Sequence, residues 1–138
     1  MQKKIHHVGI AVPSINEAIE FHIKGLGMKQ ESEIIEDEIL NVKLVLLSFP
    51  QQHIENAYLE LVEPLKRPSP VDEILERKNR LYHYCIEVPN LKDALKTARE
   101  NHGIIVKRPT PAKLFNGRLI AFVWTTSNYL IEFLETRK

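Results

Sequence analysis

The sequence predicts an α+β fold made of two tandem βαβββ modules. The first observation is a repeated motif, because His7-Val-Gly-Ile-Ala-Val12 returns 76 residues later as His83-Tyr-Cys-Ile-Glu-Val88. The second is that each motif precedes a segment with helical periodicity and then a set of apolar segments with strand character. The third is that the last strand of each set holds a glutamate between apolar residues, Glu60 in one case and Glu132 in the other.

In the first module, the segment 5–12 has the period of a strand, because one set of alternate residues is branched and the other is not. The branched set is Val8, Ile10 and Val12, and the other is His7, Gly9 and Ala11. Ser14 then begins a helix, since its hydroxyl can accept a hydrogen bond from the amide of Glu17 in a capping box. Gly25 and Gly27 are expected to end this helix. Three further strands are predicted at 30–36, 42–49 and 57–63.

The second module repeats this order. A strand is predicted at 81–88, and Asn90 is placed to cap the next helix, with Asp93 three residues further on. Gly103 is expected to stop that helix. The remaining strands are predicted at about 104–108, 117–125 and 129–135, with a turn at Thr126-Ser-Asn128.

The segment between the modules predicts a short linker helix. Ser69 is positioned as its cap and Pro70 as its first residue, and Val71, Ile74 and Leu75 form an apolar stripe. We therefore expect one domain over residues 1–138, with module one at 1–64, the linker helix at 65–79 and module two at 80–138.

Composition and charge narrow the functional classes. The 138 residues are 43% hydrophobic and 27% charged with a net charge of +1, which is typical of a globular domain and lacks the basic run expected of a nucleic-acid or anionic-membrane binder. No apolar stretch approaches the roughly 20 residues of a membrane span. Cys85 is the single cysteine, so no intramolecular disulfide is expected, and a cytoplasmic location is predicted.

The repeated histidines and glutamates predict a divalent-metal site. An isolated ionised carboxylate among apolar strand residues is costly, so Glu60 and Glu132 need a compensating partner. His7 and His83 occupy equivalent strands, 53 and 49 residues before these glutamates. Imidazole and carboxylate ligands suit Zn, Co, Ni, Mn or Fe as the metal ion.

A purely structural interpretation competes with the metal site. A strand histidine is often a packed residue with a satisfied hydrogen bond, and the repeat could persist for packing alone. We expect His6, His22, His53 and His102 to have no ligand role. Strand glutamates Glu63, Glu87 and Glu135 are expected to be solvated or at a sheet edge.

Together these motifs resemble the vicinal-oxygen-chelate superfamily, which includes glyoxalases, extradiol dioxygenases and bleomycin-resistance proteins. Within it the chain is most similar to methylmalonyl-CoA epimerases. The resemblance covers nearly the whole chain and includes the following segments: His7-Val-Gly-Ile-Ala-Val12, Leu59-Glu-Leu-Val-Glu-Pro-Leu65, Leu81-Tyr-His-Tyr-Cys-Ile-Glu-Val88, Asn116-Gly-Arg-Leu-Ile-Ala-Phe122 and Leu130-Ile-Glu-Phe-Leu-Glu135. It implies a U-shaped mixed sheet around one metal, with His7, Glu60, His83 and Glu132 at the ligand positions.

Two positions depart from the epimerase pattern. Ile39 stands where these epimerases have a catalytic loop glutamate, and Glu38 lies one place earlier. Several epimerases have a neutral amide at the position of Glu60, whereas two histidines with two glutamates resemble the ligands of lactoylglutathione lyase, also called glyoxalase I.

The resemblance implies a metal-dependent enzyme with a small thioester or hemithioacetal substrate. An epimerase would move an α-proton through a metal-stabilised enediolate, with Glu132 and Glu38 as the proton-transferring pair and Glu60 in reserve. Three alternatives stay open: a glyoxalase I-type isomerisation, a non-haem iron dioxygenase using His7, His83 and Glu132, and a non-catalytic small-molecule binder. The resemblance also implies a homodimer.

Overall fold

The computed structural model describes residues 3–50 and 57–136, which form two compact units. One unit runs from His7 to Tyr82, and the other joins the described residues up to His6 with those from His83 onward. The ring of His6 meets Phe115 edge-on, with centroids 5.1 Å apart, so the start of the first strand packs with the second unit's residues.

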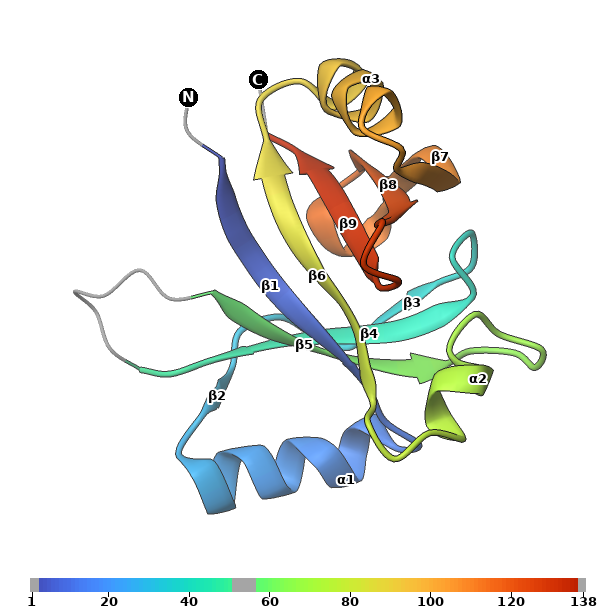
Figure 1. The fold of residues 1–138 in the computed structure, drawn as a ribbon. Coiled ribbons are helices and arrows are strands. Elements are labelled where there is room, and N and C mark those ends of the chain that lie inside the picture. The colour runs from blue at the N-terminus through green and yellow to red at the C-terminus, as the bar shows by residue number, and fades with distance from the viewer. Residues whose placement is uncertain (1–2, 51–56, 137–138) are drawn as a thin grey trace. The chain divides into compact units, whose positions relative to one another are not determined.

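The first βαβββ module lies in the His7–Tyr82 unit, except for the first three residues of β1, which belong to the other unit (Figure 1). Its elements are β1 (Lys4–Ala11), α1 (Ile15–Glu20), the π-helical turn η1 (Phe21–Gly25), β2 (Lys29–Gln30), β3 (Ile35–Asp37), β4 (Val42–Ser48), β5 (Tyr58–Pro64) and α2 (Asp72–Leu75). Strand β5 pairs in parallel with β1 and antiparallel with β4, and both β2 and β3 pair with β4. Helix α1 covers one face of this sheet, where Ile15 packs with Val45, Leu47 and Leu61.

The second module repeats the same topology. Its elements are β6 (Leu81–Val88), α3 (Leu91–Glu100), β7 (Ile104–Ala112), the 3₁₀ turn η2 (Lys113–Phe115), β8 (Arg118–Trp124) and β9 (Leu130–Glu135). Strand β9 pairs in parallel with β6 and antiparallel with β8, and β7 lies outside β8. Helix α3 buries Leu91 and Leu95 against Val123 and Phe133 on one sheet face. The two tandem βαβββ modules of the predicted α+β fold are therefore confirmed.

The predicted starts of the two module helices, α1 and α3, are confirmed. The amide of Glu17 donates to Ser14 Oγ at 3.3 Å, and the amide of Asp93 donates to Asn90 Oδ1 at 2.9 Å. Each cap residue has extended backbone angles, as an N-cap requires. The first helical segment ends at Gly25 with Leu26 as its cap, and Gly27 then adopts a positive φ of 75°, as expected.

Three element predictions were wrong in extent. The strand predicted at 30–36 is two short strands, because Ser32 interrupts it. The hydroxyl oxygen of Ser32 accepts a hydrogen bond from the backbone amide of Leu46. The linker helix spans only Asp72–Leu75, and Val71 takes the cap position. The carboxylate of Asp72 accepts a hydrogen bond from the backbone amide of Ser69, which holds the residues before the helix in a turn. Strand β7 extends to Ala112 because it is an outer strand with register shifts, where prolines remove no ladder hydrogen bond.

Helix α3 ends shortly before Gly103, the residue predicted to stop it. Glu100 is its last residue, and His102, rather than a glycine, has a positive φ of 72°. Gly103 then donates its amide to the carbonyl of Ala98 at 2.8 Å, which closes the end of the helix. Within the part of the chain that the structure describes, no helix is long and apolar enough to cross a membrane.

Candidate metal centre

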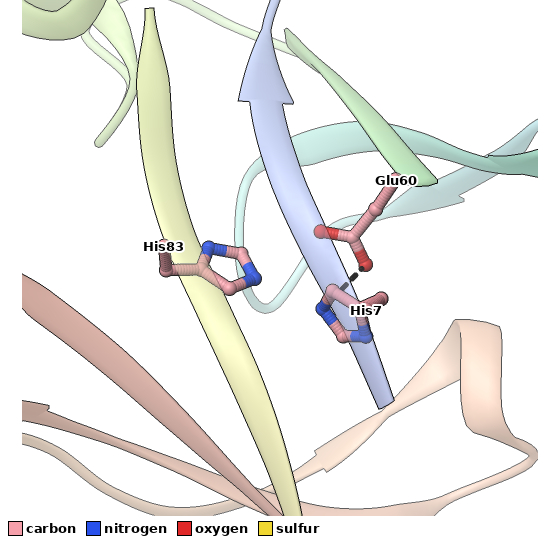
Figure 2. Close-up of side chains that lie close together, drawn as sticks. All are labelled: His7, Glu60 and His83. Atoms are coloured by element: carbon pink, nitrogen blue, oxygen red, sulfur yellow. Dashed lines mark ion pairs between the residues drawn. The ribbon is translucent and has the colours of Figure 1, made fainter. Parts of the chain in front are cut away.

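The first module holds a buried histidine–glutamate pair. His7 lies on β1 and Glu60 on the adjacent strand β5, where the register places Glu60 opposite Gly9. His7 Nε2 lies 3.4 Å from Glu60 Oε2, and the two side chains are 0% and 3% exposed (Figure 2). Gly9 is buried and, as a glycine, places no side chain beside Glu60.

The second module holds an equivalent pair. His83 lies on β6 and Glu132 on β9, opposite Cys85. His83 Nε2 lies 3.2 Å from Glu132 Oε1, and both side chains are buried. The ring of Phe122 on β8 meets the imidazole of His83 edge-on at 5.3 Å between centroids, which restricts the rotation of the histidine.

The two pairs occupy the same positions in their modules. In each, the residue opposite the glutamate comes two places after the histidine and is small, Gly9 or Cys85. On the other side the glutamates face Leu46 and Phe122, and each of these lies 39 residues after its histidine. The whole difference in spacing therefore falls between the last two strands, where nine residues separate β4 from β5 and five separate β8 from β9.

Each pair lies on the sheet face that its helix leaves uncovered. In a strand, alternate residues point to opposite faces. Leu61 and Phe133, each one residue beyond the glutamate, belong to the cores under α1 and α3. Glu60 and Glu132 therefore point away from the helices, into the face that carries the histidines.

The chemistry of these pairs fits a divalent metal. Two buried carboxylates would be expensive without compensation. Imidazole nitrogen and carboxylate oxygen are ligands for Zn, Co, Ni, Mn and Fe ions. Each module can offer one nitrogen ligand and one oxygen ligand to such an ion.

Glu38 is placed differently from the other predicted site residues. It lies exposed in the turn after β3, whose last residue, Asp37, pairs with Val42. Val42 pairs with Pro64, four residues beyond Glu60 on β5. At ~3.3 Å per residue this is about 13 Å along the strand, so the module does not bring Glu38 next to the His7–Glu60 pair.

Sequence reasoning missed the role of two other strand glutamates. The carboxylate of Glu63 accepts a hydrogen bond of 2.8 Å from the backbone amide of Ile15, the first residue of α1. The carboxylate of Glu135 accepts an equivalent bond of 2.8 Å from the amide of Leu91, the first residue of α3. Both lie three residues after a predicted ligand. The expectation of solvated positions was wrong for them, and the repeat of Glu60-x-x-Glu in the second module was the signal that could have identified this role.

Glu87 is also not a solvated residue. Its carboxylate accepts a hydrogen bond from the guanidinium of Arg118, and both side chains are largely buried. Of the histidines predicted to have no ligand role, His22 bonds through Nδ1 with the carbonyl of Ala18 at 2.7 Å, and His102 is exposed. His53 lies outside the described residues.

The sequence model of the Glyoxalase/Bleomycin resistance protein/Dioxygenase superfamily matches residues 6–122. The chain belongs to this superfamily, which confirms the resemblance seen in the motifs.

Two relatives and one solved structure show which members of the superfamily the chain is similar to. The chain is 31% identical to the uncharacterised protein YqjC of Bacillus subtilis strain 168, over 97% of this chain and 93% of that protein. It is 33% identical to the mitochondrial methylmalonyl-CoA epimerase of Homo sapiens, over 67% of this chain and 50% of that protein. The crystal structure of methylmalonyl-CoA epimerase from Mycobacterium tuberculosis has the same fold, with a TM-score of 0.82 and 22% identity over 97% of this chain and 88% of that chain.

Proposed function

We propose that His7, Glu60, His83 and Glu132 together hold one divalent metal ion, and that the protein is an epimerase acting on an acyl-CoA thioester similar to methylmalonyl-CoA. The observation that carries the proposal is the buried histidine–glutamate pair that recurs at the same register in both modules. Each pair offers too few ligands to hold an ion alone. Two equivalent pairs together offer the four ligands that one shared ion requires.

The relatives support the choice of substrate class. The human relative at 33% identity is a methylmalonyl-CoA epimerase, and so is a Dictyostelium discoideum relative that is 26% identical over 87% of this chain. An enzyme of this kind must weaken a C–H bond next to a thioester carbonyl. When bound, the metal ion would act as a Lewis acid toward the carbonyl oxygen.

The carboxylates of the chain would move the proton. Epimerisation needs one group to remove the α-proton from one face of the carbon and another to return a proton to the opposite face. Glu132 and Glu38 were predicted as this pair, with Glu60 in reserve. The exposed position of Glu38, about 13 Å along the strand from Glu60, favours Glu60 as the partner of Glu132.

A glyoxalase I-type isomerisation is a second candidate. Glu60 is a carboxylate rather than a neutral amide, and the turn before β4 presents Ile39, 62% exposed, instead of a glutamate. Both features match a mechanism in which one carboxylate removes a proton and returns it to the neighbouring carbon.

The test is an exchange experiment with the metal-loaded protein in heavy water. With methylmalonyl-CoA we expect deuterium at the α-carbon, and we expect Glu60→Gln to lower the exchange rate by about 10²–10⁴-fold while the bound metal is kept, because an amide oxygen can ligate but cannot carry a proton. Glu38→Gln, which removes an exposed carboxylate from the same module, is the matched control and should keep the rate within about threefold.

The outcomes separate the candidates. Formation of lactoylglutathione from methylglyoxal and glutathione, without deuterium uptake into methylmalonyl-CoA, would replace the epimerase with the lyase. No reaction with either substrate by fully metal-loaded protein would reject both and leave the dioxygenase and binder alternatives. A large loss of rate in Glu38→Gln, with Glu60→Gln unaffected, would show that Glu38 and Glu132 are the proton-transferring pair.

A further inference from the structure

A pocket of about 850 Å³ lies between α3 and the strands β7 and β8, entirely within the second unit. Helix α3 packs against β7, β8 and β9 (Figure 1). The pocket opens on the helix-covered face, because Leu91 and Leu95 of α3 line it. His83 and Glu132 point to the opposite face, so the α3 pocket is separate from the candidate metal centre.

The walls of the α3 pocket differ in character. Its apolar part consists of Leu91, Leu95, Ile105, Pro109 and Leu119. An apolar surface of this kind, partly formed by a proline ring, suits a flat or aliphatic group of a ligand.

Four cationic side chains surround this apolar part, and two carboxylates accompany them. The cations are Lys92, Lys96 and Arg99 from α3 and Arg108 from β7, and the carboxylates are Asp93 and Glu135. Since Glu135 already accepts the amide of Leu91, part of its charge is directed at the helix start. The pocket therefore concentrates positive charge in a chain whose net charge is only +1.

The cations are available to a ligand. Lys92, Arg99 and Arg108 are exposed and form no ion pair with any residue in the described ranges 3–50 and 57–136, while Lys96 has only an exposed contact of 3.8 Å with Glu100. Their spacing along α3, four and then three residues, places them in a row about 10 Å long on one side of the helix. A single carboxylate is too short to meet such a row.

We propose that the α3 pocket binds a nucleoside diphosphate group, with the base on the apolar wall and the two phosphates along the row of cations. Phosphate oxygens accept charge-assisted hydrogen bonds from lysine and arginine, and a diphosphate spans neighbouring cations where an isolated anion does not. The proposal does not rest on the proposed epimerase function, because it uses other residues and the other sheet face.

The test is a calorimetric titration of the full-length protein with ADP at low ionic strength. We expect saturable binding that adenosine alone shows at least about tenfold more weakly, because it lacks the phosphates. The double variant Lys92→Gln/Arg108→Gln should weaken ADP binding by at least about tenfold. The control Arg77→Gln/Lys78→Gln removes two exposed positive charges from the segment after α2 and should leave the affinity within about twofold, because these residues lie outside the pocket.

Circular dichroism and a melting curve verify that both double variants are folded. Coenzyme A contains an adenosine 5′-diphosphate that carries an additional 3′-phosphate, so a second titration with it distinguishes the source of the ligand. Displacement of ADP by coenzyme A identifies the nucleotide end of a thioester as one occupant, and failure to displace ADP identifies a free nucleotide. Absence of saturable ADP binding would overturn the proposal. So would equal weakening in both double variants, or equal binding of adenosine and ADP.

Discussion

At the scale of single residues, Gly103 shows how closely the end of helix α3 approaches the sheet. A Cβ atom at this position would lie 2.9 Å from the carbonyl oxygen of Ala98 and 3.1 Å from Val123 Cγ1. The carbonyl belongs to the last turn of α3 and accepts the amide of Gly103, so it cannot move without opening the end of the helix. Glycine is therefore required by space here, not by its backbone angles.

We expect Gly103→Ala to lower the free energy of unfolding by about 1–3 kcal/mol, the usual cost of forcing an extra methyl group into packed atoms. Gly25→Ala is the matched control, because its added Cβ would meet only the exposed ring of Phe21, which can turn aside. Alanine also favours helix, so the control should be neutral or more stable by up to about 1 kcal/mol. Urea denaturation measures both values, and an undiminished stability of Gly103→Ala would contradict the explanation.

A pair of tyrosines gives a prediction about pH. The hydroxyls of Tyr84 and Tyr129 lie 2.9 Å apart, and this hydrogen bond, with partial burial and the charge of Tyr129, raises the pKa of Tyr84 above its ordinary value of 10.0. A raised pKa means that the folded state favours the neutral phenol. The contribution to stability is therefore complete below the unfolded pKa and is lost as the pH rises through the folded pKa.

In Tyr129→Phe we expect the pKa of Tyr84 to fall toward 10.0, because its largest cause, the hydrogen bond, is removed. The measurement is the absorbance of the phenolate during an alkaline titration. The loss of stability above about pH 10 should also be smaller in the variant than in the parent protein. An unchanged titration curve for the most weakly acidic tyrosine would show that the pair does not control this pKa.

The candidate ligands could be predicted because their signal is a repeat, whereas single residues without a repeated context were harder. His7 and His83 stand in matching motifs, and Glu60 and Glu132 stand alone among apolar neighbours. The role of Glu87 depends on Arg118, which lies 31 residues away and reaches it only after β6, β8 and β9 have assembled. No local pattern encodes such a contact.

At the scale of elements, each βαβββ module connects its helix to its last strand through one carboxylate. Glu63 on β5 and Glu135 on β9 accept the first helical amide of α1 and α3 at 2.8 Å. These amides have no partner inside the helix, and a carboxylate there also interacts favourably with the helix dipole. The contact fixes the start of each helix against the sheet.

We expect Glu135→Ala to lower the free energy of unfolding by about 1–3 kcal/mol, because it leaves the partly buried amide of Leu91 without its acceptor. Glu135→Gln should cost less, since the amide oxygen still accepts and only the charge is lost. Glu100→Ala, at the exposed end of the same helix, should change stability by no more than about 0.5 kcal/mol. Equal stability of all three variants would contradict this function of Glu135.

The elements differ in how far local sequence determined them. The starts of α1 and α3 were predictable, because Ser14 and Asn90 act on amides three residues away. The extent of β7 was not, because Pro109 and Pro111 argue against a strand unless the strand is known to be an outer one. The break between β2 and β3 likewise depends on a contact from Ser32 to β4.

At the scale of the whole molecule, the two modules match more closely in strand register than in the number of residues between histidine and glutamate. The four-residue difference between the two histidine–glutamate separations lies wholly between the last two strands of each module, so the strands that carry the pairs keep the same register. Selection for packing alone would not require a histidine and a glutamate at these positions, because apolar residues pack there without any desolvation cost. The repeated geometry of the two pairs within one chain therefore supports the proposal that they bind a ligand.

A shared ion predicts one metal per chain and an equal need for both modules. Metal analysis after dialysis against Zn, Co, Ni, Mn or Fe salts should give a stoichiometry near one, because a single histidine and a single glutamate make a weak site alone. His7→Ala and His83→Ala should each abolish tight binding, and the exposed His102→Ala should not. Chelation of the bound metal should lower the melting temperature of the parent protein and leave both ligand variants unchanged, since a ligand that binds only the folded state stabilises it. Two metals per chain, or the loss of half of the bound metal in each variant, would show that the modules bind separately and would end the proposal of a single centre.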